Sequence, residues 1–399
     1  MFDYIKIEGF RSFKKVELEM PRLAVLIGPN GGGKSNFLDL LMLMAEAGNG
    51  QLTNGVTKRG GFREIAFGFD VSREVRIEIV LKEALHPWRV ATEGGGGKLD
   101  IRFGMAVRGQ GYFAVRVTEE LLRQESVEQP SLTTEIVSRS AEQADIRNKD
   151  EFGRINQRTI GVAAGELVIS QVRDPISYPA ATVLLKELGG WCFYRDIDVG
   201  SRSAVRQPAV IRPDIRLLDD GSNLSPVLYS IQEGHPDLWG EILEDLRTAY
   251  PDFVKLTVPA GGGDGKVLLR WFERPYAKQG MSANLLSDGT LKLLCLVAIL
   301  KTPDPPPLIS IDEPELGLHP DWIELVAELL QDAASRTQVI VATHSPQIVA
   351  KLDPEQVIVT EKVDGETHLR QLKTGDLQNW LKDFSLAELW LSGEIGGRP

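Results

Sequence analysis

The sequence predicts an α/β fold with a mostly parallel core sheet, an antiparallel β subdomain and an inserted α/β lobe. Three patterns predict it. Leu23 to Ile27 is continuously apolar, which is typical of a strand buried on both faces of a parallel sheet. From Glu74 to Lys82 apolar and charged residues alternate, and we extend this antiparallel meander over residues 74–118. From Ser287 onward helical and strand patterns alternate, as in parallel strands joined by crossover helices.

Composition limits the class of protein. The chain has 399 residues, of which 42% are hydrophobic and 25% charged, so it can bury a large core in two or three structural units. Its net charge of −11 argues against nucleic-acid binding by the surface as a whole and leaves a local basic patch open. Its two cysteines, Cys192 and Cys295, lie in apolar runs and are interpreted as buried thiols rather than metal ligands.

We expect a soluble, cytoplasmic protein with no membrane partner. The first residues, MFDYIKIEGFRSF, alternate like a strand and lack the basic head and apolar core of a secretory signal. The longest apolar stretch, Leu293 to Leu300, is far shorter than the roughly 20 residues that a membrane-spanning helix needs.

The other elements follow in chain order. Short strands are predicted at Tyr4–Glu8 and Val16–Glu19, and a helix from Lys34 to Ala47 after a glycine-rich turn. Two more helices are predicted, from the N-cap residue Asn223 to Glu233 and from Asp237 to Ala249. Runs of glycine or proline mark loops at Gly94–Gly97, Gly261–Gly263 and Pro305–Pro307.

Three domains are expected. Residues 1–118 form an N-terminal lobe, residues 119–280 an inserted lobe and residues 281–399 a C-terminal half. Residues 119–165 are polar without sustained periodicity, so we interpret them as a surface insertion that is partly flexible. The inserted lobe has no long heptad run, which predicts a compact lobe rather than coiled-coil arms.

The strongest local motif is Gly28-Pro29-Asn30-Gly31-Gly32-Gly33-Lys34-Ser35, a complete GxxxxGK[ST] between a buried strand and an apolar helix. Its glycines allow the backbone to wrap around phosphates, and the helix N-terminus favours negative charge. Lys34 is suited to reach the β- and γ-phosphates, and Ser35 to bind Mg²⁺. A purely structural turn is the alternative, and the combination of strand, lysine, serine and helix argues against it.

A second motif is the apolar strand Leu308–Ile311 followed by Asp312 and Glu313. A carboxylate at the tip of a buried strand is costly unless it serves a cation or another charged partner. Asp312 is therefore predicted to hold Mg²⁺ and Glu313 to polarise the attacking water. The alternative is a strand that simply leaves the core through two acidic residues.

Two further motifs are weaker by themselves, and their functional interpretation depends on the two motifs above. Ser287 and Asp288 precede Gly289 and an apolar helix, and they are suited either to cap that helix or to expose its N-terminus to an anion. His344 ends the strand Val339–Thr343, where it is either structural or placed to sense a γ-phosphate.

In their order along the chain, GPNGGGKS, LSDGT, LISIDEPELGLHP and VATHS resemble the Walker A, signature, Walker B with D-loop and switch-histidine motifs of ABC ATPases. The opening GFRSF and the SDGT signature without a following glutamine resemble the RecF–SMC–OLD branch of that family rather than transporter subunits. Similarity over residues 50–280 is weaker, although DGSNL at 220–224 is also similar to this branch. In related OLD-type proteins a Toprim nuclease domain follows the ATPase. The 55 residues that follow His344 here are too few for such a domain.

The resemblance implies roles for individual residues. ATP phosphates and Mg²⁺ would be bound by Asn30, Gly31, Gly32, Gly33, Lys34, Ser35 and Asn36. Arg11 and Ser12 would lie near the base or ribose, and Glu315–Pro320 would be the D-loop. Asp312 would be the Mg²⁺ acid, Glu313 the catalytic base and His344 the γ-phosphate sensor, while Lys34 also assists catalysis. For the Q-loop glutamine, a metal ligand, Gln171 after an expected strand Glu166–Ser170 is one candidate and Gln51 a poorer one.

The same resemblance implies a homodimer. Ser287 and Gly289 of one copy would contact the ATP held by the other copy, so that two copies enclose two ATP molecules. The expected role is a nucleotide-driven switch or clamp in DNA repair or anti-phage defence. The alternative is a regulatory ATPase that controls a separately encoded nuclease or toxin without binding DNA itself. A transporter subunit fits poorly with the long gap between Lys34 and Ser287.

Two surface hypotheses stay open. Five arginines lie close together in the sequence and form either a DNA-facing strip or part of a solvated loop and strand edge. They are Arg195, Arg202, Arg206, Arg212 and Arg216. The apolar tail packs on the protein's own surface or docks a partner through Phe384, Leu386, Leu389, Trp390 and Leu391. The pair Asp196 and Asp198 is interpreted as structural.

Overall fold

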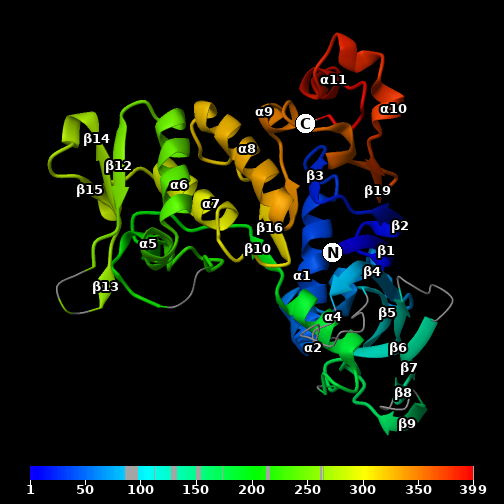
Figure 1. The fold of residues 1–399 in the computed structure, drawn as a ribbon. Helices are drawn as coiled ribbons and strands as arrows, with labels where there is room; N and C mark the ends of the chain where they lie inside the picture. Colours follow the sequence, from blue (N-terminus) through cyan, green and yellow to red (C-terminus); the bar gives the residue numbers. More distant parts are fainter. Residues whose placement is uncertain are drawn as a thin grey trace. The chain divides into compact units, whose positions relative to one another are not determined.

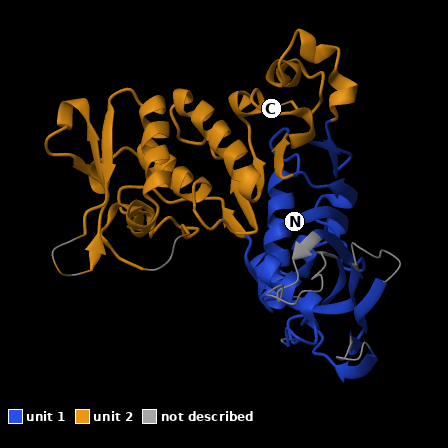
Figure 2. Cartoon of the chain, viewed as in Figure 1, with its two compact units in different colours: residues 1–21, 28–191, 358–372 blue, residues 22–27, 192–357, 373–399 orange. Residues whose placement is uncertain are grey.

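The computed structural model describes residues 1–85, 98–111, 113–126, 133–149, 154–172, 174–212, 216–260, 263 and 265–398. The chain divides into two compact units, which Figure 2 colours separately. Unit 1 contains residues 1–21, 28–191 and 358–372, and unit 2 contains residues 22–27, 192–357 and 373–399. Each unit is therefore assembled from three separate stretches of the chain. The loops predicted at Gly94–Gly97 and around Gly261 lie outside the described residues.

Unit 1 is built on an eight-stranded antiparallel sheet in the order β2-β1-β4-β5-β6-β7-β8-β9 (Figure 1). The strands are β1 (Phe2–Phe10), β2 (Phe13–Glu19), β4 (Val75–Leu85), β5 (Lys98–Gln110), β6 (Ala114–Ser126), β7 (Thr133–Ser140), β8 (Gln143–Lys149) and β9 (Ile155–Gly161). Val75, Ile77, Ile79 and Leu81 share one buried face of β4, and Ile77 and Ile79 pair with Ile7 and Ile5 of β1. The predicted antiparallel meander over 74–118 is confirmed for the residues of that range that the structure describes.

Helices and a hairpin complete unit 1. They are α1 (Lys34–Gly48), α2 (Leu52–Lys58), α3 (Phe62–Ile65), η1 (Phe67–Phe69) and α4 (Pro179–Gly189), with the hairpin of β18 (Val357–Val363) and β19 (Glu366–Gln371). The helix predicted from Lys34 to Ala47 is confirmed as α1. Helices α1 and α4 pack closely, since a Cβ on Gly48 would lie only 2.8 Å from Leu188 Cβ.

The structure differs from the sequence prediction over residues 119–165. Strand β6 runs through residue 118, the expected end of the N-terminal lobe, and β7 to β9 continue the same sheet within unit 1. Most of β9 is exposed and β7 is only partly buried, so neither strand needs the apolar alternation that reveals a strand in sequence. The residues at 127–132 and 150–153, part of the expected flexible insertion, lie outside the described residues.

Unit 2 contains four parallel strands in the order β10-β16-β17-β3. They are β10 (Cys192–Tyr194), β16 (Leu308–Asp312), β17 (Gln338–Ala342) and β3 (Leu23–Ile27). All five residues of β3 and of β17 are buried, as the continuous apolar runs predicted. Asp312 is the register partner of Ala342, and Ala342 of Leu26, so the carboxyl ends of three strands lie in line.

The longer helices of unit 2 are α5 (Leu224–Gly234), α6 (Pro236–Ala249), α7 (Asp288–Leu300) and α8 (Pro320–Arg336), and short ones are α9 (Pro346–Val349), α10 (Thr374–Leu377) and α11 (Leu386–Ser392). The first two confirm the helices predicted near Asn223 and Asp237. Single turns are η2 (Ala204–Arg206), η3 (Arg274–Tyr276), η4 (Ala283–Leu285), η5 (Pro354–Gln356) and η6 (Trp380–Lys382). Small sheets join β11 (Ala209–Val210) to β13 (Lys266–Val267), and β12 (Phe253–Thr257) to β14 (Arg270–Glu273) and β15 (Met281–Ser282).

The C-terminal tail packs on unit 2. Leu386, Leu389 and Trp390 are buried, and the indole Nε1 of Trp390 donates to Gly397 O. Phe384 and Leu391 stay about half exposed, at 47% and 54%. Packing on the protein's own surface is therefore confirmed for the three buried side chains. Across the described residues, every helix is too short or too polar to cross a membrane.

Two buried charged side chains attach an irregular segment to the sheet of unit 1. Glu120 of β6 lies opposite Arg139 of β7, and both are almost fully buried. The carboxylate of Glu120 accepts from the backbone N–H groups of Val168 (2.6 Å) and Ile169 (2.9 Å). The guanidinium of Arg139 donates to the carbonyl oxygens of Ala141, Ala163, Ala164 and Glu166. These bonds hold residues 163–169 on β6 and β7 without any strand pairing.

Burial raises the pKa of Glu120 to about 7, against the opposing effects of the two N–H donors and Arg139. An acid with a raised pKa in the folded chain contributes stability that is present below its unfolded pKa of 4.5 and is lost as pH rises through about 7. Glu120→Leu removes this titration. We expect the advantage of the natural chain over Glu120→Leu in unfolding free energy, measured by urea denaturation, to shrink by about 3 kcal/mol between pH 4.5 and 8. A difference that grows with pH would contradict this assignment.

Candidate nucleotide site

The glycine-rich loop Gly28–Ser35 lies in unit 1 and follows the last residue of β3 directly. Three of its glycines have positive φ: Gly28 (146°), Gly31 (75°) and Gly33 (110°). A Cβ on Gly28 would lie 2.2 Å from Thr360 O, and a Cβ on Gly33 would lie 2.6 Å from Thr367 Oγ1. The loop therefore needs glycine at both positions, for its backbone conformation and for its close approach to the β18–β19 hairpin.

Lys34 lies inside the loop. Its side chain is buried, and Nζ donates to Gly28 O (2.7 Å) and Pro29 O (3.2 Å). Carbonyl oxygens of the loop thus hold the ammonium against the turn. Its contact with the phosphate oxygens of a nucleotide stays a prediction. Asn30, Gly31 and Ser35 are exposed at the same loop.

Hydrogen bonds tie the loop to residues predicted near the base or ribose. Thr367 Oγ1 lies 3.0 Å from Gly32 O and 2.8 Å from Ser12 Oγ. Asn36 Nδ2 donates to Ser12 Oγ (2.8 Å), and Arg11 donates to Asn36 Oδ1 (3.2 Å). The structure therefore brings Arg11, Ser12 and Asn36 together beside the glycine-rich loop.

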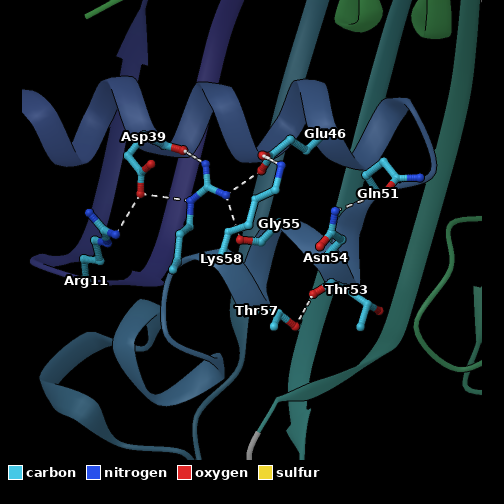
Figure 3. Close-up of polar contacts among 10 residues, drawn as sticks. Arg11, Asp39, Glu46, Gln51, Thr53, Asn54, Gly55, Thr57 and Lys58 are labelled. Carbon is cyan, nitrogen blue, oxygen red and sulfur yellow. Dashed lines mark hydrogen bonds and ion pairs between the residues drawn. The ribbon is translucent and has the colours of Figure 1, made fainter. Parts of the chain in front are cut away.

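The sequence prediction missed two residues that extend this network. Asp39 of α1 accepts from Arg11 Nη2 (2.8 Å) and from Arg59 Nε (3.0 Å) (Figure 3). Arg59, only 7% exposed, also donates to Gly55 O and to Glu46 Oε2, which fixes the end of α2 against α1. An acid inside the apolar run Phe37-Leu38-Asp39-Leu40-Leu41 was the available signal.

A second group of predicted residues lies at the strand ends of unit 2. Asp312 ends β16, and Glu313 follows with a φ of 50°, a conformation that few residues other than glycine adopt. The backbone N–H of Glu313 donates to Ala342 O (2.8 Å), which anchors it to β17. His344 follows β17 by two residues and is half-buried. Asp312, Glu313 and His344 therefore belong to one edge of the parallel sheet.

Glu315 bonds to the two residues that follow β17 and was missed as an individual residue. Its Oε1 accepts from Thr343 Oγ1 (2.7 Å) and from the backbone N–H of His344 (2.7 Å). Lys292 of α7 is also close to this edge, with Nζ 3.5 Å from Glu313 O. Burial lowers the pKa of Lys292, against the raising effect of the carboxylates of Glu315, Glu313 and Asp196. The signal in sequence was a lysine in an otherwise apolar helix.

The signature residues open α7. Ser287 is its N-cap and accepts from Thr290 N (3.1 Å), as predicted. A Cβ on Gly289 would lie 2.8 Å from Gly317 O, so the start of α7 lies against the segment that follows Glu315. Both Ser287 and Asp288 are exposed. The cap geometry and the exposure together leave the helix N-terminus accessible.

Gln171 and Gln51, the two Q-loop candidates, line one hollow of about 690 Å³ in unit 1. The strand expected over Glu166–Ser170 is absent, because turns occupy these residues and the bonds from Glu120 and Arg139 hold them. The side-chain amide of Gln171 donates to Glu166 Oε2 (2.7 Å). Its role as a metal ligand stays a prediction.

The prediction of a DNA-facing arginine strip is wrong for one of its five residues. Arg206 is 5% exposed and bonds to backbone carbonyls of its own unit, so it cannot face DNA. Arg216 donates to Asp304 O (3.0 Å) and Oδ2 (3.3 Å), while Arg202 and Arg212 are exposed. The burial of Arg206 could not be predicted from helical periodicity, because the helix that contains it is a single turn.

Two family models match the chain. Residues 1–103 match "AAA ATPase domain", and residues 193–350 match "AAA domain, putative AbiEii toxin, Type IV TA system". The first range includes the glycine-rich loop, and the second includes the signature residues, the acidic strand end and His344. Matched ATPase domains imply nucleotide binding and point to ATP hydrolysis.

Several curated proteins are similar to this chain in sequence. A "Putative ABC transporter ATP-binding protein" of Methanosarcina acetivorans is 33% identical over 26% of this chain and 36% of its own length. A DNA repair protein RecN of Deinococcus radiodurans is 32% identical over 30% of this chain and 22% of its own. The retron Ec83 probable ATPase of Escherichia coli is 21% identical over 88% of this chain and 70% of its own. The chain thus spans about a third or less of the length of the first two.

Solved structures show the same fold. An SMC head bound to the C-winged helix domain of ScpA superposes with a TM-score of 0.55 at 16% identity, covering 94% of this chain and 99% of that one. The fold is a mixed α/β fold like that of an SMC head, with a parallel-mixed sheet and an antiparallel sheet. With its glycine-rich loop, acidic strand end and matched domains, the chain is a P-loop ATPase of the AAA type, related to SMC and RecN heads and to retron ATPases.

Proposed function

We propose that this chain binds ATP with Mg²⁺, hydrolyses it, and dimerises around two ATP molecules as a nucleotide-driven switch. One observation carries the proposal. Leu26, Ala342 and Asp312 are register partners on neighbouring parallel strands, and the glycine-rich loop begins two residues after Leu26. In open parallel sheets ligands bind beyond the carboxyl ends of the strands. We therefore propose that the two acids and His344 at this edge, and the glycine-rich loop that continues β3, take part in nucleotide binding and hydrolysis.

The proposed chemistry divides among these groups. Lys34 and the inward N–H groups of the loop bind the β- and γ-phosphates, and Ser35 and Asp312 hold Mg²⁺, directly or through water. The metal would neutralise charge that develops on the phosphates. Glu313 orients and polarises the attacking water, and His344 senses the γ-phosphate. Glu315 supports this role of His344, because it bonds to the backbone N–H of that residue.

The exposed start of α7 supports the dimerisation that we propose. This helix has 13 residues, so its N-terminus carries a substantial positive partial charge, and Ser287 adds a hydroxyl. Two such ends would repel each other across a symmetric interface. A γ-phosphate between each end and the facing glycine-rich loop would turn this repulsion into attraction, so that ATP closes the dimer and hydrolysis opens it.

The glycine-rich loop can be tested with a matched pair of substitutions. Gly33→Ala combines a φ of 110° with a clash at 2.6 Å, whereas Gly31→Ala has a φ of 75° and no heavy atom within 4 Å of the added carbon. We expect Gly33→Ala to weaken the binding of a fluorescent ATP analogue by at least about tenfold, and Gly31→Ala to weaken it much less. Equal effects would contradict the packing argument.

Glu313→Gln tests the assignment of the base. The amide cannot accept a proton from water, so we expect the ATP hydrolysis rate to fall by about 100-fold or more while ATP binding is kept. Closed dimers should accumulate with ATP and be visible by light scattering after size exclusion. Glu324→Gln, which alters an exposed carboxylate on α8 of the same unit, is the control. Hydrolysis by Glu313→Gln at the rate of the natural chain would refute the assignment.

For the biological output we propose DNA repair or anti-phage defence, supported by the names of the RecN and retron relatives. A second candidate is a regulatory ATPase acting on a separately encoded nuclease or toxin. The burial of Arg206 and the net charge of −11 favour it, because they weaken the case for a DNA-binding surface. DNA binding by ATP-bound Glu313→Gln dimers at low salt, lost in Arg202→Gln or Arg212→Gln, would favour the first role. Absence of binding would favour the second.

A further inference from the structure

We infer that Arg206 positions the signature loop, residues 283–288, for contact with the nucleotide of the partner copy. The inference rests on the proposed dimer. It concerns a residue that lies 81 positions before Ser287 in sequence, in the single turn η2. Arg206 does not touch nucleotide in this proposal. It acts on the backbone that precedes α7.

The guanidinium of Arg206 joins two segments of unit 2. Nε lies 3.0 Å from both Val199 O and Gly200 O. Nη1 donates to Leu286 O (2.7 Å) and lies 3.2 Å from Ala283 O and 3.4 Å from Asn284 O. Nη2 donates to the carboxylate of Asp288 at 2.5 Å. All of the side-chain nitrogens are therefore bonded, and most of their acceptors lie within five residues of Ser287.

Only arginine can make this set of bonds. Its planar group has five N–H donors in a rigid fork, whereas lysine has one flexible nitrogen with three donors. The side chain is 5% exposed, so each carbonyl that lost its donor would be left in a poorly solvated place. Residues 283–286 contain only a single turn and no strand, so Arg206 supplies the bonds that regular structure would otherwise supply.

The other end of this segment returns to the catalytic edge of the sheet. Residues 195–206 leave the carboxyl end of β10, which pairs in parallel with β16, the strand that ends in Asp312. Burial lowers the pKa of Lys292 against the raising effect of the Asp196 carboxylate on this segment, and Lys292 Nζ lies 3.5 Å from Glu313 O. The segment thus connects the acidic strand end to the signature loop within one unit. Arg206 is the point at which that connection reaches Leu286 and Asp288, the two neighbours of Ser287.

The consequence for the proposed cycle is specific. Ser287 and the N–H groups of α7 can complete the partner's site only if residues 283–288 hold one conformation, because a displacement of about 1 Å misplaces a binding group. Loss of Arg206 should therefore weaken dimer closure. It should leave ATP binding by a single copy unchanged, because the glycine-rich loop belongs to unit 1.

The test uses the full chain carrying Glu313→Gln, so that hydrolysis does not empty the dimer. Four substitutions are introduced into this background: Arg206→Gln, Arg206→Lys, Asp288→Ala and Arg216→Gln. Arg216→Gln is the control, because Arg216 bonds to Asp304, outside the signature loop. Monomer affinity for a fluorescent ATP analogue is measured at low protein concentration. The dimer dissociation constant with ATP is measured by analytical ultracentrifugation.

We expect Arg206→Gln to raise the dimer dissociation constant by at least about tenfold, and Asp288→Ala by a few-fold. Arg206→Lys should lie between them, and Arg216→Gln should match the background. Monomer affinity for ATP should change less than twofold in all four. A general loss of stability would instead lower monomer ATP affinity and dimerisation together, and that result would overturn the positioning role.

Two further outcomes separate the inference from the function on which it rests. Asp288 is 70% exposed, so Asp288→Ala should fold even if Arg206→Gln does not, and dimerisation of Asp288→Ala equal to the background would then overturn the inference. Ser287→Arg places a bulky cation at the signature itself. If Ser287→Arg dimerises normally, the signature contact fails and the inference fails with it. If Ser287→Arg alone blocks closure, only the role of Arg206 is refuted.

Discussion

The register of three buried parallel strands is the constraint on which the candidate site depends. Strands β16, β17 and β3 are almost entirely apolar and buried, and they pair along their length. The chain therefore leaves the core only at the ends of these strands. Leu26, Ala342 and Asp312 mark that line. Polar groups that follow them meet solvent at one edge, because a buried carboxylate without a partner would be costly. The acids, His344 and the glycine-rich loop are thus each found at or just after the end of a strand.

Buried charges organise the segments that have no core of their own. Asp39 with Arg59, Glu120 with Arg139, and Arg206 each make several hydrogen bonds, mostly to backbone. Each joins an irregular stretch to a helix or strand: the end of α2, residues 163–169 and the signature loop. Such groups add little net stability compared with apolar packing, but breaking one partner leaves a buried charge unpaired. Their contribution is to select one conformation of segments that apolar packing leaves undetermined.

Sequence reasoning succeeded where the signal is local. The buried run of β3, the alternation of β4 and the cap at Ser287 each depend on neighbouring residues, and each was correct. It failed over β7 to β9, because partly exposed strands need no apolar alternation. It also failed for Glu166–Ser170, where distant side chains hold turns in a stretch that resembles a strand, and for Arg206, whose charge suggested solvent.

The sequence by itself determined the chemistry of the candidate site: glycines of positive φ followed by Lys34 and Ser35, two acids after an apolar run, and a serine-capped helix. Spacing along the chain is covalent, and residue type limits what each group can do. Only the tertiary structure decided which distant atoms complete these groups. Thr360 and Thr367 close on Gly28 and Gly33 from more than 300 residues away, and Glu315 bonds to His344. Arg206 holds Leu286 and Asp288. These contacts depend on which segments the fold brings together, and residue order alone does not state that.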